Sequence, residues 1–291
     1  MDPIAWITGN KIPLGRTIRD GVDWLDDRAA FVFWAISDTL GAVIEGVTGA
    51  LLWAHPLAIV AAFAALAYGL HRDLKLVALV VGGLLLVINL GYWRETMETL
   101  ALVSFATALC MAIGVPLGVA AARRDWLYRA LRPLLDLAQT IPTFVYLIPT
   151  LILFGLGVVP GLISTVIFAI AAPVRLTHLG ITSTPRALVE AGESFGASRR
   201  QILWKIELPH AAPTIMAGLT QCIMLSLSMV VIAALVGAGG LGAPVVRALN
   251  TVNIAMGFEA GLAIVVLAIV LDRLCKHPGG NAGRNAGATT R

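Results

Sequence analysis

The sequence contains little charge, and its long apolar stretches contain almost no ionisable residues. Charged residues make up 13% of the 291-residue chain, whereas hydrophobic residues make up 58%. A soluble domain of this length carries roughly a quarter charged residues, so a soluble globular fold is excluded. A β-barrel is also excluded, because its strands alternate over about ten residues instead of staying apolar for about twenty. The composition predicts an all-α polytopic membrane protein.

Cysteine and catalytic motifs are equally scarce. The three cysteines, Cys110, Cys222 and Cys275, fall in or beside apolar stretches without a CxxC motif, so neither disulfides nor a zinc or other metal site is indicated. The chain has no GxxxxGK[ST] phosphate loop, no HExxH and no GxSxG. We therefore expect no catalytic residues and no bound cofactor. The N-terminus lacks the basic start and compact apolar run of a secretory signal, so we expect it to be retained.

Hydropathy divides the chain into four parts. Residues 1–49 form an amphipathic helix that either lies along the membrane surface or packs across the spans, and the sequence favours neither. Residues 50–98 hold two spans, residues 99–274 form a core, and the Gly-rich tail, residues 275–291, is expected to be disordered. The seven predicted spans are Ala50–Leu70, Leu76–Trp93, Thr99–Ala122, Ala138–Gly157, Pro160–Leu179, Ile215–Val236 and Ala255–Leu271.

The distribution of positive charge predicts the orientation of these spans. With the N-terminus outside and seven crossings, 15 of the 21 Lys and Arg residues fall on the inside. The outside segments hold only Lys11, Arg16, Arg19, Arg28, Arg94 and Arg247. The positive-inside rule therefore predicts an outer N-terminus and a cytoplasmic C-terminus.

The longest polar interval between apolar segments is residues 184–209, TPRALVEAGESFGASRRQILWKIELP. Thr184 is a suitable N-cap for a first short helix, and Gly196 ends that helix by permitting a positive φ. Ser198 and Gln201 have the spacing of a capping box that starts a second helix. Leu188, Ala191 with Gly192, and Phe195 recur at helical spacing in the first helix, and the apolar stripe of the second consists of Ile202, Leu203 and Ile206. Two short helices with apolar faces, held between spans, are typical of a segment that a partner's groove binds.

Pro209 is expected to end the second helix. Two other interpretations of the interval are an ordinary amphipathic linker and a DNA-binding helix-turn-helix. A DNA-binding element has no reason to lie between membrane spans, so no nucleic-acid partner is expected.

Glycine and proline punctuate the apolar stretches at several points. Residues 237–242 read GAGGLG and satisfy GxGxxG, but no strand–helix–strand unit surrounds them, so we expect a tight re-entrant turn instead of a nucleotide site. Prolines interrupt the third predicted span at Pro116, beside Gly114 and Gly118, and the fourth at Pro142 and Pro149, as occurs where a water-filled path satisfies the freed carbonyl groups. The polar and aromatic residues beside the second break are candidates for a translocation path, and they are Gln139, Thr140, Thr143, Phe144 and Tyr146. The two aromatic side chains suit a quaternary ammonium group through cation–π attraction.

Several stretches resemble the permease of glycine betaine/proline/choline ABC importers, the quaternary-amine family. They include RPLLDLAQTIPTFVYLIPTLILFGLG (residues 132–157), FGASRRQILWKIELPHAAPTIMAGL (residues 195–219) and LSLSMVVIAALVGAGGLG (residues 225–242). The polar interval is similar to the EAA loop of such permeases, with Gly192 where Ala is usual. The residues that match this loop are Glu190, Ala191, Gly192, Gly196, Ile206, Leu208 and Pro209.

The resemblance implies a type I ABC-importer permease fold in the cell inner membrane. It implies a homodimer of permeases, two cytoplasmic ATPase subunits that dock on the EAA loop, and a separate extracytoplasmic substrate-binding protein. ATP and Mg²⁺ would be bound by the ATPase, which would drive alternating access for glycine betaine, choline, proline or related osmoprotectants.

Three other functions stay open at this point. An ion-coupled secondary carrier of small zwitterions is the weaker alternative, because such carriers usually keep a carboxylate or His inside their spans. A membrane-embedded enzyme lacks a catalytic constellation. An ABC permease for another amino-acid-like solute would share every feature above.

Overall fold

The computed structural model describes residues 13–276, which form helices joined by short turns. The prediction of an all-α fold is thus confirmed for this range, whereas most of the predicted tail lies outside it. The elements in chain order are α2 (Leu14–Trp53), α3 (Pro56–His71), α4 (Leu74–Asn89), α5 (Trp93–Arg123), α6 (Asp125–Thr140), α7 (Thr143–Phe154), α8 (Val158–Ala169), α9 (Ala171–Thr182), α10 (Arg186–Ser194), α11 (Arg199–Ile202), the π-helical turn η1 (Leu203–Glu207), α12 (Leu208–Ala233), the 3₁₀ turn η2 (Ala234–Val236), α13 (Gly242–Asn250) and α14 (Ile254–Cys275).

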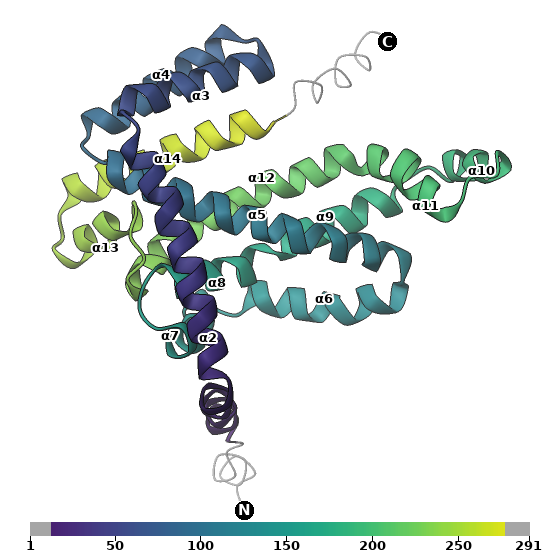
Figure 1. Ribbon diagram of the computed structural model, residues 1–291, viewed down its shortest axis with the longest axis horizontal. Helices are drawn as coiled ribbons and strands as arrows, with labels where there is room; N and C mark the ends of the chain where they lie inside the picture. Colours follow the sequence, from purple (N-terminus) through teal and green to yellow (C-terminus); the bar gives the residue numbers. More distant parts are fainter. Residues whose placement is uncertain (1–12, 277–291) are drawn as a thin grey trace, which may run out of the picture.

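Helices α5, α9 and α12 pack together at the centre of the molecule (Figure 1). Glycines allow this approach. A Cβ atom added at Gly118 of α5 would lie 2.6 Å from Thr177 Cβ of α9, and one at Gly180 of α9 would lie 2.9 Å from Ala211 Cβ of α12. Small residues at such contacts let membrane helices pack backbone against backbone, where no hydrophobic driving force exists between them.

Helices α3 and α4 form a hairpin that packs on α14 (Figure 1). The buried side chains of this contact include Val80, Leu84 and Val270. Each helix of the hairpin has 16 residues, a length of about 24 Å at 1.5 Å per residue, which is shorter than a hydrocarbon core of about 30 Å.

By length and composition, residues 13–276 contain five helices able to cross a membrane, or six if a bent pair counts as one span. This is fewer than the seven spans predicted. The first predicted span, Ala50–Leu70, is divided, because its first residues finish α2 and α3 begins at Pro56. The fourth, Ala138–Gly157, is the bent pair α6 and α7, whose axes meet at 96°.

The N-terminal helix α2 packs across α5, α7 and α8, so packing across other helices, one of the two predicted placements, is observed (Figure 1). The Ser37 hydroxyl donates a hydrogen bond to the Phe154 carbonyl oxygen at 2.9 Å, and the Phe33 ring meets the Phe154 ring edge-on at 5.3 Å. The helix runs without a break through residue 50, where the sequence predicted a boundary between two parts.

Pro116 does not interrupt α5, which continues from Trp93 to Arg123. The glycines beside it lie against α9, since a Cβ at Gly114 would come within 2.8 Å of Pro173 Cγ. The prediction of a broken third span is therefore wrong: α5 continues through Pro116, and Gly114 and Gly118 serve close packing. Pro142, in contrast, is the N-cap of α7 and lies at the 96° bend, as predicted. The predicted interruption at Pro149 is wrong, because α7 continues through this residue.

Candidate functional site

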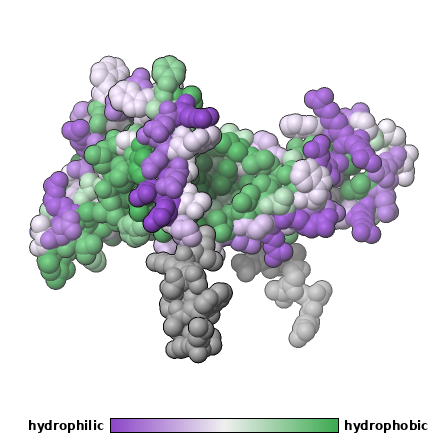
Figure 2. All heavy atoms as spheres, turned by 90° about the horizontal axis from the view of Figure 1, so that it is seen from below, coloured by the Kyte–Doolittle hydropathy of each residue, from purple (hydrophilic) through white to green (hydrophobic). Residues whose placement is uncertain are grey.

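The polar interval forms a protruding elbow made of α10, α11 and η1, at one end of the molecule (Figure 1). We call residues 186–207 the elbow, with α10 as its first limb and α11 together with η1 as its second limb. Figure 2 shows hydrophilic residues gathered at this end, whereas hydrophobic residues cover much of the neighbouring bundle. Helix α10 has no buried residue, so its whole circumference is open to a partner or to solvent, apart from its contact with the second limb.

Gly196 makes the turn between the two limbs of the elbow. Its φ is +76°, as the sequence predicted, and an added Cβ would meet no atom within 4 Å. The turn is closed by two backbone hydrogen bonds, from Gly196 N–H to the Glu193 carbonyl at 2.9 Å and from Ala197 N–H to the Gly192 carbonyl at 3.0 Å. The left-handed conformation, not lack of space, is thus the reason for glycine at this position.

The second limb starts with the predicted capping box. Ser198 N–H donates to Gln201 Oε1 at 2.8 Å, and Gln201 N–H donates to Ser198 Oγ at 3.4 Å. The predicted cap of the first limb is wrong by one position, because Pro185 is the N-cap and α10 begins at Arg186. Thr184 instead has a buried hydroxyl without a hydrogen-bond partner among residues 13–276.

Two of the predicted loop residues face each other inside the elbow. A Cβ at Gly192 of α10 would lie 2.6 Å from Ile206 Cδ1 of η1, and Ile202 beside them is 3% exposed. These residues therefore hold the limbs together and do not form an open face. Glu190 and Ala191 lie on the exposed surface of α10.

The outward apolar surface of the elbow comes from three large side chains. Phe195 is 93% exposed, Trp204 is 62% exposed and Leu188 is 48% exposed. The sequence predicted Leu188 and Phe195 as part of an apolar face but did not identify Trp204. The signal that could have identified it is a tryptophan within an otherwise polar interval. Exposed aromatic side chains on a polar projection are the kind of anchor that protein interfaces bury.

The prediction that Pro209 ends the second limb is wrong. The chain passes from η1 directly into α12, with Leu208 and Pro209 in its first turn. The Leu208 N–H bonds to the Leu203 carbonyl, five residues back, and this wider π turn accommodates a residue that lacks an N–H. The elbow is consequently continuous with one of the long central helices.

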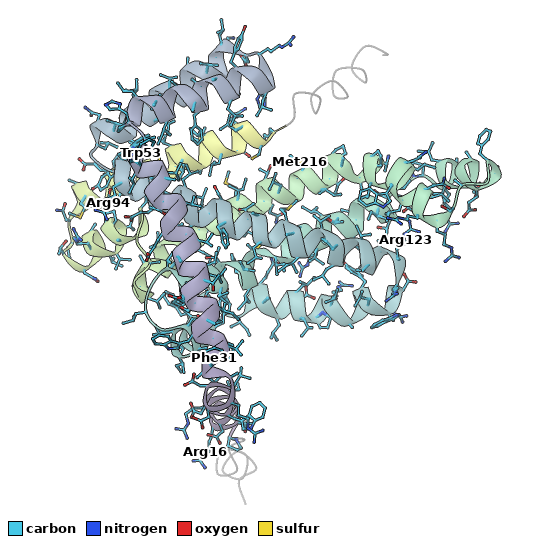
Figure 3. All side chains as sticks on the ribbon, viewed as in Figure 1. Arg16, Phe31, Trp53, Arg94, Arg123 and Met216 are labelled. Atoms are coloured by element: carbon cyan, nitrogen blue, oxygen red, sulfur yellow. The ribbon has the colours of Figure 1, made fainter. Side chains whose placement is uncertain are left out.

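The elbow is also tied to the end of α5. Arg123 Nη2 contacts Glu207 Oε2 at 2.5 Å and donates to the Arg199 carbonyl oxygen at 3.4 Å. The side chains are 32% and 12% exposed for Arg123 and Glu207, so the ion pair is partly shielded from water. Figure 3 shows Arg123 at the end of α5 that lies toward the elbow.

The five candidate path residues lie around the bend between α6 and α7. Gln139 and Thr140 end α6, and Thr143, Phe144 and Tyr146 start α7. The bend therefore lies among them, and their part in a translocation path stays a prediction.

The two aromatic residues of this set do not share a face of α7. Phe144 is 53% exposed, whereas the Tyr146 hydroxyl is buried without a hydrogen-bond partner in the part of the chain that the structure describes. Residues two apart on a helix point in different directions, so the two rings lie on different faces of α7. Contact of either ring with an ammonium group stays a prediction.

Comparison with known proteins identifies the family. Residues 114–277 match the model of the "Binding-protein-dependent transport system inner membrane component" family, and this range contains the elbow and most of the central bundle. The chain belongs to this family. It is an ABC-importer permease of the inner membrane, as the sequence predicted.

Whole-length relatives agree with the family match. The permease is 43% identical over 268 residues to the glycine betaine transport system permease protein OpuAB of Bacillus subtilis (strain 168), covering 92% of this chain and 94% of that protein. It is 44% identical to the glycine betaine/proline betaine transport system permease protein ProW of Escherichia coli (strain K12), covering 92% of this chain and 75% of that protein.

A solved structure supports the fold. An inward-facing structure of the MetNI methionine ABC transporter is similar with a TM-score of 0.56 at 23% identity, over 67% of this chain and 94% of that chain. The permease therefore has the type I ABC-importer fold.

Proposed function

We propose that this permease moves glycine betaine, choline or a related osmoprotectant across the membrane, driven by a separate ATPase. The observation that supports this class of substrate is the 42–44% sequence identity to three glycine betaine permeases over at least 90% of the chain. The aligned stretches of 266–269 residues are longer than the family-matched range 114–277, so the similarity extends beyond the common core.

The elbow is the proposed docking site of the ATPase. A partner can bind the exposed helix α10 and the exposed side chains of Phe195 and Trp204. Because η1 continues into α12, displacement of the bound elbow would also move the central bundle. Glu190, Ala191 and Gly196 lie on its outer surface, Gly192 and Ile206 hold its limbs together, and Leu208 and Pro209 join it to the bundle.

We place the elbow in the cytoplasm because it carries Arg186, Arg199, Arg200 and Lys205 and contacts Arg123 at the end of α5. An outer N-terminus with a cytoplasmic C-terminus, as the charge distribution predicts for seven crossings, would require the short helices α3 and α4 to cross the membrane as well. ATP and Mg²⁺ would be bound by two copies of the ATPase, while this chain holds no cofactor and catalyses no reaction. A second permease copy would complete the path beside the α6–α7 bend, and a separate binding protein would deliver the substrate outside. Alternating access would follow when ATPase closure displaces the elbows.

The test substitutes an exposed position of α10. Ala191→Arg adds a bulky charge to the docking surface without touching a buried side chain, so the permease should reach the membrane at its normal level but lose the ATPase on purification. Ala191→Ser is the matched control and should retain the ATPase.

Uptake completes this test. Radiolabelled glycine betaine should accumulate in cells that carry the intact system, and Ala191→Arg should abolish this accumulation. Full ATPase retention and uptake in Ala191→Arg would contradict the docking site. Uptake by the permease alone in liposomes, abolished by a protonophore, would support an ion-coupled carrier instead.

A further inference from the structure

Helix α5 connects the elbow to the opposite end of the molecule. It has 31 residues without a break, a length of about 45 Å at 1.5 Å per residue. Figure 3 shows Arg94 and Arg123, which mark its two ends, on opposite sides of the bundle. Both ends make polar contacts with the same other stretch of chain, the one that runs from α11 through α12 to α13.

At the elbow end, Arg123 contacts both the first and the last residue of the second limb. The Arg199 carbonyl belongs to the first residue of α11, and Glu207 is the last residue of η1. The contact therefore spans the whole limb, including the π turn. A π turn is a rare and poorly stabilised departure from the α-helix, so it is the place where α12 yields most easily to a displacement of the elbow.

At the opposite end, α5 holds the glycine-rich turn between η2 and α13. Gly240 N–H donates to Glu98 Oε2 at 2.7 Å, and Leu241 N–H donates to Thr99 Oγ1 at 2.8 Å. Gly240 has a φ of +87°, and an added Cβ would lie 2.5 Å from Thr99 Oγ1. The turn thus rests directly on α5, which confirms the prediction of a tight turn at residues 237–242.

We propose that α5 transmits displacement of the elbow to this glycine-rich turn, with Arg123 as the positioning residue that engages it. The proposal rests on the proposed docking of an ATPase at the elbow. The covalent connection through α12 contains the π turn η1, whereas the contact of Arg123 with the Arg199 carbonyl oxygen joins α5 to the part of the elbow that precedes this turn. The ion pair with Glu207, at the end of η1, holds the Arg123 guanidinium in place for that contact. Without the ion pair, movement of the elbow would be absorbed in η1 before it reached the far end.

The experiment measures coupling in the complete importer, reconstituted with its ATPase and binding protein in lipid vesicles. The readout is the stimulation of ATP hydrolysis by binding protein saturated with glycine betaine, per ATPase retained. Arg123→Gln should leave ATPase retention unchanged but reduce this stimulation by roughly tenfold, in the usual range of coupling between distant sites. Arg124→Gln is the matched control, because Arg124 lies beside Arg123 and forms no ion pair within residues 13–276.

Two further variants separate transmission from a general structural role. Reversing the pair, Arg123→Glu with Glu207→Arg, should restore most of the stimulation that either single reversal removes. Glu98→Ala loosens the far end of α5 and should reduce stimulation as Arg123→Gln does. Because both act through one helix, the combined variant should lose no more than either alone.

Normal stimulation in Arg123→Gln, failure of the reversed pair, or multiplying losses in the combined variant would each overturn the role of α5. Failure of the unsubstituted permease to retain its ATPase would instead overturn the proposed function. The two failures are distinguishable, because the second needs no variant.

Discussion

The elbow predicts a graded response to substitution at Gly196. An added Cβ there meets no atom within 4 Å, so the cost of a side chain is confined to the backbone, whose φ is +76°. For an L-residue this conformation costs about 1–2 kcal/mol, less for Asn and more for a β-branched residue. We expect Gly196→Asn to destabilise the elbow least, Gly196→Ala more and Gly196→Val most.

The strain acts on the elbow and not on the bundle, because a side chain at Gly196 would begin in open space and push against no neighbouring atom. If docking requires the present conformation, about 1 kcal/mol in Gly196→Ala weakens ATPase binding about fivefold. Gly196→Asn should bind within about twofold of the unsubstituted permease, and Gly196→Val should bind less tightly than Gly196→Ala.

The assay is a titration of the purified ATPase onto the permease in nanodiscs. Gly91→Ala is the control, because Gly91 has a φ of +80° and open space around an added Cβ but lies in the turn between α4 and α5, at the end of α5 opposite the elbow. It should show the same backbone strain with unchanged ATPase affinity. Equal affinity for Asn, Ala and Val at Gly196, or an equal loss in Gly91→Ala, would refute the reasoning.

Three more predictions concern local packing. Ser198→Ala removes the capping box and should destabilise α11 by about 1 kcal/mol, seen as faster amide hydrogen exchange in the second limb with no change in the bundle. Gly242→Ala would place a Cβ 2.2 Å from a backbone carbonyl oxygen of α12, so it should cost about 1–3 kcal/mol and lower the thermal midpoint in detergent, whereas Gly82→Ala, with nothing within 4 Å, should not. Gly118→Leu would drive a side chain into Thr177 of α9 and should reduce the amount of permease in the membrane, and a normal level would contradict the close α5–α9 contact.

Local features of the elbow were predictable because the residues that determine them are neighbours in sequence. Ser198 and Gln201 are three apart and satisfy each other's backbone, and Gly196 must take a conformation that other residues avoid. Pro209 was misjudged for the opposite reason. A proline ends an α-helix only if the preceding turn stays α-helical, and the π turn before it removes that condition.

Predictions about contacts between distant segments succeeded less often. The stripe of Ile202 and Ile206 indicated an apolar face, but only the fold shows that this face closes on Gly192 inside the elbow. The tie between Arg123 and Glu207 joins residues 84 positions apart, and nothing in the spacing of either one identifies the other. The two aromatic residues at the bend are close in sequence, but only the fold shows that Phe144 is exposed while the Tyr146 hydroxyl is buried.

The sequence alone determined that this protein folds in a membrane, that it is all-helical and where along the chain the polar elbow lies. Those properties follow from apolar length, charge placement and neighbouring caps, which act over one or two helical turns. Only the tertiary structure decided how many helices are long enough to cross a membrane and which glycines are packing surfaces. Only the tertiary structure also shows that α5 contacts both the elbow and the glycine-rich turn at residues 237–242. Such contacts depend on which helices pack side by side, and this cannot be deduced from apolar surfaces that resemble one another.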